Sequence, residues 1–84
     1  MSRQDKLIER LLSYPTDFSF SELTALLGRF GYLISNVGRT SGSRVKFVNV
    51  EGDYIRLHKP HPRNILKPYQ INDIIIALRE RGLI

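Results

Sequence analysis

Cysteine is absent from this chain of 84 residues. A disulfide framework and a thiolate metal site are therefore both excluded, and burial of apolar side chains must stabilise the fold. The absence of cysteine also fits a reducing compartment, so we expect a cytoplasmic protein. The length suits one domain, residues 1–84, built around a single small core.

Long apolar runs are missing too. No segment approaches the roughly 18–20 apolar residues that a membrane-spanning helix needs. The opening residues, MSRQDKLIER, lack the uncharged apolar core of a signal peptide. We therefore expect a soluble chain with no membrane partner.

Most sequence signatures of enzymes are absent as well. The chain has no P-loop, no dinucleotide-binding fingerprint, no HExxH motif and no convincing pair of carboxylates. Ser41 and Ser43 flank a glycine, where turn serines are far more common than nucleophiles. The two histidines, His58 and His61, lack the further ligands that a zinc site requires. If the chain moves protons near neutral pH, these histidines are the suitable side chains.

Acidic residues are scarce in the middle of the chain, and this scarcity accounts for the whole net charge of +5. Residues 1–38 hold four basic and four acidic side chains, and residues 68–84 are also balanced. Residues 39–67 hold seven basic side chains against only Glu51 and Asp53. The middle of the chain is therefore the part expected to meet a polyanion.

Apolar spacing predicts three helices. The first covers residues 3–14 and stops before Pro15. The second follows Ser19, which has capping-box spacing to Glu22, and ends near Gly31. The last begins at Pro68 and ends near Gly82. The run Ile74–Ile76 is also compatible with a strand because its residues are β-branched, but the helical stripe and both end signals favour a helix.

Between the second and third helices, short β-rich runs alternate with glycines. The runs YLISNV, RVKFVNV and YIRLHKP predict an antiparallel meander of three strands, because the connections are only a few residues long. The predicted fold class is α+β, with a three-stranded antiparallel sheet packed on helices in the order ααβββα.

Alternation along the strands places basic side chains on one face of the sheet. Arg44 and Lys46 share a face of the second strand, while Val45 and Phe47 occupy the other. Arg56 and His58 share the corresponding face of the third strand. Like charges on neighbouring strands repel unless an anion lies over them, so this face is a candidate polyanion site. An ordinary solvated sheet face is the alternative.

A second group of cations lies in the segment HKPHPRNILKPY, residues 58–69. Its three prolines restrict the directions in which the basic side chains point. Lys67 also stands at the start of the last helix, whose free amides attract phosphate. The basic residues of this segment are His58, Lys59, His61, Arg63 and Lys67.

The order of these motifs resembles the HicA family of bacterial toxins over residues 21–84. The matching stretches are FGY at residues 30–32, TSGSRVKF, HKPHP and the closing LKPYQINDIIIALRERGLI. The resemblance implies a fold like that of double-stranded-RNA-binding domains and a role as an mRNA interferase in a toxin-antitoxin system. It also implies RNA as substrate and a HicB-type antitoxin as protein partner. No metal or organic cofactor is needed, since attack by the 2′-hydroxyl can run on acid-base catalysis. Residues 3–14 form an N-terminal extension relative to the shortest members.

The family's catalytic histidine typically follows the Gly-Ser step directly, and here that position holds Arg44. Arginine stays protonated, so it binds phosphate or stabilises charge but serves poorly as a base. We hypothesise that His58, on the same face of the neighbouring strand, takes over proton transfer. The catalytic candidates are Arg44 and His58. The candidate RNA-binding residues are Arg39, Ser43, Arg44, Lys46, Arg56, His58, Lys59, His61, Arg63 and Lys67.

Two other functions fit the same sequence. In one, the chain is a non-catalytic RNA-binding module whose cations supply only phosphate contacts. In the other, it is a protein-interaction domain whose positive face meets an acidic partner.

Overall fold

The computed structural model describes residues 3–35, 44–60 and 63–84. The helices and strands follow one another in the predicted order ααβββα, so the predicted α+β fold is confirmed. Their bounds are α1 Arg3–Leu12, α2 Phe20–Arg29, β1 Leu33–Ile34, β2 Arg44–Val48, β3 Tyr54–His58 and α3 Pro68–Glu80. Among the described residues, no helix is long and apolar enough to cross a membrane.

Helix α2 begins with the predicted capping box. The Ser19 hydroxyl accepts from the Glu22 backbone N–H at 3.1 Å, and the Glu22 carboxylate accepts from the Ser19 N–H at 3.0 Å. These two bonds satisfy donors that the first turn of a helix otherwise leaves without partners. At the other end, Gly31 adopts a φ of 89°, which a residue without a Cβ takes at little cost.

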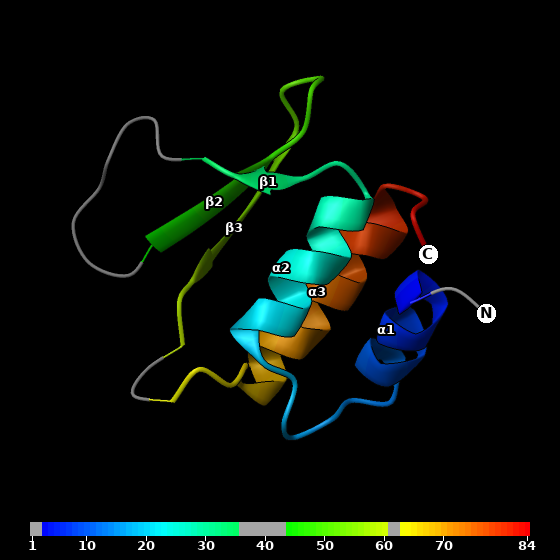
Figure 1. The fold of residues 1–84 in the computed structure, drawn as a ribbon, viewed down its shortest axis with the longest axis vertical. Coiled ribbons are helices and arrows are strands. Elements are labelled where there is room, and N and C mark those ends of the chain that lie inside the picture. Colours follow the sequence, from blue (N-terminus) through cyan, green and yellow to red (C-terminus); the bar gives the residue numbers. More distant parts are fainter. Residues whose placement is uncertain (1–2, 36–43, 61–62) are drawn as a thin grey trace.

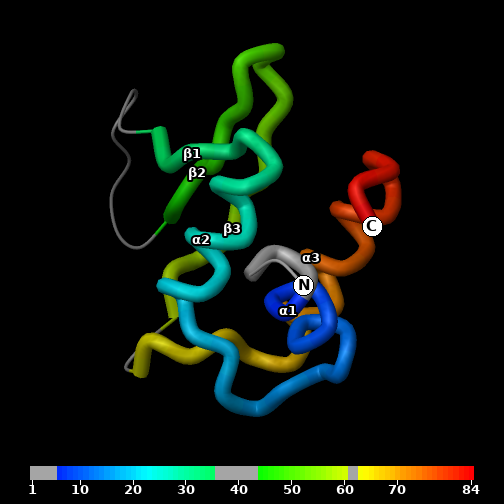
Figure 2. Tube along the Cα trace, turned by 45° about the vertical axis from the view of Figure 1, so that its right-hand side comes forward, coloured from blue at the N-terminus to red at the C-terminus, as the bar shows by residue number. Residues whose placement is uncertain are grey.

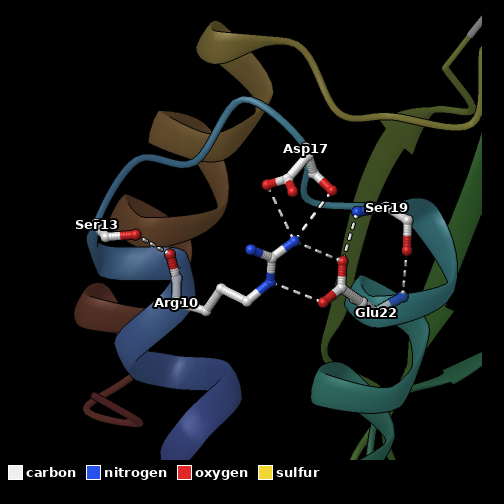
Figure 3. Close-up of polar contacts among 5 residues, drawn as sticks. All are labelled: Arg10, Ser13, Asp17, Ser19 and Glu22. Atoms are coloured by element: carbon white, nitrogen blue, oxygen red, sulfur yellow. Dashed lines mark hydrogen bonds and ion pairs between the residues drawn. The ribbon is translucent and has the colours of Figure 1, made fainter.

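Helix α1 ends at Leu12, two residues before the predicted limit. It packs on α2 and α3 through apolar side chains that include the fully buried Leu11. A polar link reinforces this packing, because the Arg10 guanidinium makes a two-pronged contact with the Glu22 carboxylate at 2.8 and 3.0 Å (Figure 3). Arg10 also reaches Asp17 in the connection between the two helices.

Helix α3 contains the isoleucine run, so the alternative of a strand there is wrong. Ile74 and Ile75 are buried while Ile76 is exposed, as the helical spacing requires. Pro68 occupies the first turn and the helix ends just before Gly82, whose φ is 70°. Both end signals in the sequence therefore operate as predicted.

The sheet is antiparallel with the strand order β1-β2-β3. Phe47 of β2 pairs with Ile55 of β3, and both are buried on the face that meets the helices. The Phe47 ring lies 6.0 Å from that of Phe20 on α2, which joins the sheet to the helical layer. Figures 1 and 2 show the three helices gathered on one side of the sheet, while the opposite side faces outward.

The segment that leads into α3, residues 63–67, is joined by backbone hydrogen bonds to the residues at the start of α2. The Leu66 N–H donates to the Phe18 carbonyl at 2.8 Å, and the Phe20 N–H donates to the Asn64 carbonyl at 2.9 Å. Because Phe18 and Leu66 are also buried, this segment is held firmly on its way into α3.

Candidate nucleic-acid interface

The outward face of the sheet carries the predicted cations in directly opposed pairs. Arg44 pairs with His58, and Lys46 pairs with Arg56 across the β2–β3 ladder. All four side chains are exposed. The predicted alternation is therefore correct, and two pairs of basic side chains stand next to each other along the same two strands. We call these four residues the basic face.

Backbone hydrogen bonds show that both opposed pairs occupy non-hydrogen-bonded positions of the β2–β3 ladder. The Lys46 carbonyl accepts from Ser35 on the β1 side, and the His58 carbonyl accepts from Gln70 of α3. Both groups thus point away from the β2–β3 ladder, so the opposed pairs are non-hydrogen-bonded. Such pairs have Cα atoms only about 4.5 Å apart, which brings their side chains together.

Among the described residues, no salt bridge joins an acidic side chain to a residue of the basic face. Lys46 and Arg56 are two permanent positive charges directly opposite each other, and such like charges destabilise a sheet. The nearest acidic side chain along β3, Asp53, pairs with Arg81 of α3 at 2.7 Å and accepts from the Tyr32 hydroxyl. The Arg81 hydrogen bond lowers the pKa of Asp53, while burial and then the Asp53 carboxylate raise the pKa of Tyr32. An external anion would therefore relieve the repulsion on the basic face.

A groove of about 330 Å³ opens beside the first opposed pair. Its lining residues are Arg44, Arg56, Leu57 and His58. A second groove of about 330 Å³ runs between β3 and α3, and Arg56 and His58 border this one too. The second groove contains the carboxylate of Asp73, which repels phosphate, whereas the first is lined by cations without a carboxylate. The first groove is therefore the better phosphate site.

Gln70 positions the end of β3 and is the functional candidate that sequence reasoning missed. This side chain is only 4% exposed. Its amide nitrogen donates to the His58 carbonyl at 2.7 Å, and its amide oxygen accepts from the Lys67 N–H at 3.0 Å. Gln70 thereby joins the start of α3 to the strand residue that bears the imidazole. Two signals in the sequence could have found it: a polar residue on the buried stripe of α3, and a glutamine three positions after Lys67, where the partner in a capping box stands.

Tyr54 is a second residue that the sequence reasoning left out of the site. It lies on the basic face, two positions before Arg56. The Lys46 ammonium nitrogen is 4.6 Å from the centre of its ring, and the Arg56 guanidinium carbon is 5.0 Å from it. These are cation–π distances, so the ring is held among the cations.

The remaining candidates are distributed differently. Lys59 turns toward the helices, where its ammonium nitrogen lies 5.6 Å from the centre of the Phe20 ring. Arg63 and Lys67 are exposed in the connection to α3, and neither lines the groove at Arg44. Arg39, Ser43 and His61 lie outside the described residues. The structure thus brings together Arg44, Lys46, Arg56 and His58.

Metal ligation has no candidate within residues 3–35, 44–60 and 63–84, because these contain no group of three suitably placed histidine or carboxylate side chains. The chemistry that the basic face offers is phosphate binding by permanent cations, with one imidazole able to exchange a proton.

Comparison with known proteins identifies one family. The family model described as HicA toxin of bacterial toxin-antitoxin matches residues 20–83, from the first residue of α2 to just beyond α3. No curated protein and no solved structure matches the chain. Helix α1 lies outside the matched residues.

Proposed function

Because the chain belongs to the HicA toxin family, we propose that this toxin binds mRNA on its basic face and cleaves it, which arrests translation. One observation carries the proposal: Arg44 and His58 are directly opposed on neighbouring strands, at the edge of a groove lined by cations. An imidazole can transfer protons near neutral pH and a permanent cation can stabilise charge on the phosphoryl oxygens, so the pair suits metal-independent cleavage of a phosphodiester.

In the proposed reaction, neutral His58 removes the proton from a ribose 2′-hydroxyl. The resulting alkoxide attacks the adjacent phosphorus, and the bond from phosphorus to the 5′ oxygen breaks. The proton held by His58 returns to the departing oxygen, directly or through water. The products are a 2′,3′-cyclic phosphate and a 5′-hydroxyl end. Arg44 stays charged throughout and stabilises the negative charge on the phosphoryl oxygens.

Phosphates on either side of the scissile bond would contact Lys46 and Arg56. Lys59, Arg63 and Lys67 extend the positive field around the end of β3, and Arg39, Ser43 and His61 belong to the same proposed interface. A protein partner of the HicB type would cover the basic face with acidic side chains and so block access of RNA. The whole chain of 84 residues would act as one domain.

The test is cleavage of a single-stranded RNA by purified protein in EDTA. We expect His58→Ala to abolish new RNA ends and Arg44→Ala to reduce cleavage by about 100-fold or more, the usual effect of losing a group that stabilises transition-state charge. Arg79→Gln removes the same formal charge from the exposed side of α3 and serves as the matched control. In cells, induction of the wild type alone should arrest growth, and the His58 variant should not.

The position of Arg44 also favours a second candidate function, a non-catalytic RNA-binding module. Salt-sensitive binding without cleavage by the wild type would support that module. Failure to bind RNA even at low salt, together with tight binding to an acidic protein, would instead indicate a protein-interaction domain.

A further inference from the structure

We propose that Tyr54 forms a base-stacking subsite beside the phosphate groove. This inference rests on the proposed RNA-binding function and adds a residue that contacts a base to it. The basic face supplies contacts to phosphate, whereas Tyr54 supplies a contact to a base.

The position of Tyr54 in the sheet supports this role. Its register partner on β2 is Val48, and Val48 pairs in turn with Leu33 of β1. These three residues form one row across the outward face, next to the Lys46–Arg56 pair. Tyr54 is 42% exposed and Leu33 is 66% exposed. The outward face thus changes from cationic at Arg44 and His58 to apolar and aromatic toward the hairpin.

An exposed aromatic ring among cations is the arrangement that single-stranded nucleic acids prefer. Bases stack on such rings while neighbouring cations hold the backbone. In the free protein, Lys46 and Arg56 lie over the Tyr54 ring. A base that stacks on the ring would take the place of one of these cations, and the displaced cation would then be free to bind a phosphate.

Spacing along β3 separates stacking from cleavage. Tyr54 and His58 are four positions apart on one strand, which corresponds to about 13 Å. A base on Tyr54 therefore belongs to a nucleotide beyond the one at His58. In a duplex the bases stack on one another and leave no free face, so only a single strand or a loop fits both positions.

The experiment measures binding of two labelled probes by fluorescence anisotropy. One is a 2′-O-methyl oligoadenylate of about ten nucleotides, which resists cleavage, and the other is its abasic counterpart of equal length. We expect Tyr54→Leu to weaken binding of the oligoadenylate about five- to hundredfold while changing binding of the abasic probe less than about twofold. Tyr54→Phe keeps the ring and should bind like the wild type. The matched control is Tyr14→Leu, at a tyrosine that is 54% exposed after α1.

Each contrary outcome has its own meaning. Equal losses on both probes, or no loss on the oligoadenylate, would overturn the stacking subsite while leaving the proposed RNA function intact. Absence of binding of either probe by the wild type would overturn the RNA function itself. A Tyr54→Leu variant that binds RNA normally but no longer captures its antitoxin would assign this row to the protein interface. Thermal unfolding of each variant verifies that it is folded.

Discussion

Replacing Glu22 with glutamine should weaken the attachment of α1 in a manner that depends on pH. Arg10 and Glu22 connect α1, which lies outside the family match, to α2, the first matched element (Figure 3). Glutamine retains an oxygen that can accept from the Ser19 N–H, so the capping box survives the change. The variant therefore isolates the contribution of the charge on Glu22.

The structure sets the size of this contribution. The hydrogen bonds from Arg10, with smaller help from Ser19, lower the pKa of Glu22 from 4.5 to about 2. Such a lowering is equivalent to at most about 3–4 kcal/mol of stability. Because the Arg10 and Glu22 side chains are 35% and 31% exposed, solvent screening reduces the value to about 1–2 kcal/mol.

The sign follows from linkage. A carboxyl whose pKa is lower in the folded state stabilises fully above its unfolded pKa, here 4.5, and loses that effect as the pH falls toward 2. Urea unfolding at neutral pH should therefore show Glu22→Gln to be about 1–2 kcal/mol less stable than the wild type. The difference should shrink steadily between about pH 4.5 and pH 2.

A difference between the two proteins that stays constant across this pH range would refute the electrostatic account and leave packing or capping as the cause. Glu80→Gln is the control, because this exposed carboxylate of α3 forms no ion pair with any described residue. It should leave the stability near that of the wild type at every pH. Subtracting the stability of Glu22→Gln from that of the wild type at each pH also removes the contributions of the other carboxylates to the pH dependence.

Three further substitutions test a hydrogen bond, an ion pair and a turn of the fold. Gln70→Glu keeps an acceptor for α3 but cannot donate to the His58 carbonyl, so we expect a stability loss of about 1–3 kcal/mol and a larger fall in RNA cleavage than in RNA binding; equal falls would contradict a positioning role. Asp53→Asn should lower the thermal midpoint because it breaks the ion pair with Arg81. The difference from the wild type should fade as the pH drops below 3.8, since the pKa of Asp53 is lowered in the folded state. A difference that persists in acid would show that the introduced amide, and not the lost charge, destabilises the protein. Gly31→Ala should cost about 1 kcal/mol in urea unfolding, because its φ of 89° disfavours a Cβ although no atom lies within 4 Å of one; an unchanged midpoint would show that the turn relaxes.

Local signals predicted the elements well. The Ser19–Glu22 capping box, the apolar stripe of α3 and the glycines that end α2 and α3 each act within a few residues, so their physics is readable from neighbouring letters. The end of α1 was predicted two residues too late, at a point where Tyr14 adopts a φ of 54° before Pro15. A helix end there depends on both the proline and the packing of α1, and only the proline is visible in the sequence.

Three properties of this protein can be read from neighbouring residues: the order ααβββα, the alternation that separates Phe47 from Arg44 and Lys46, and the concentration of positive charge in residues 39–67. The register that opposes Arg44 to His58, and the contact of Gln70 with the His58 backbone, became visible with the three-dimensional structure. It also placed Tyr54 among the cations and turned Lys59 toward Phe20. Alternation gives the face of a side chain but not its partner, because pairing across strands and contacts to α3 join residues that are distant in the chain.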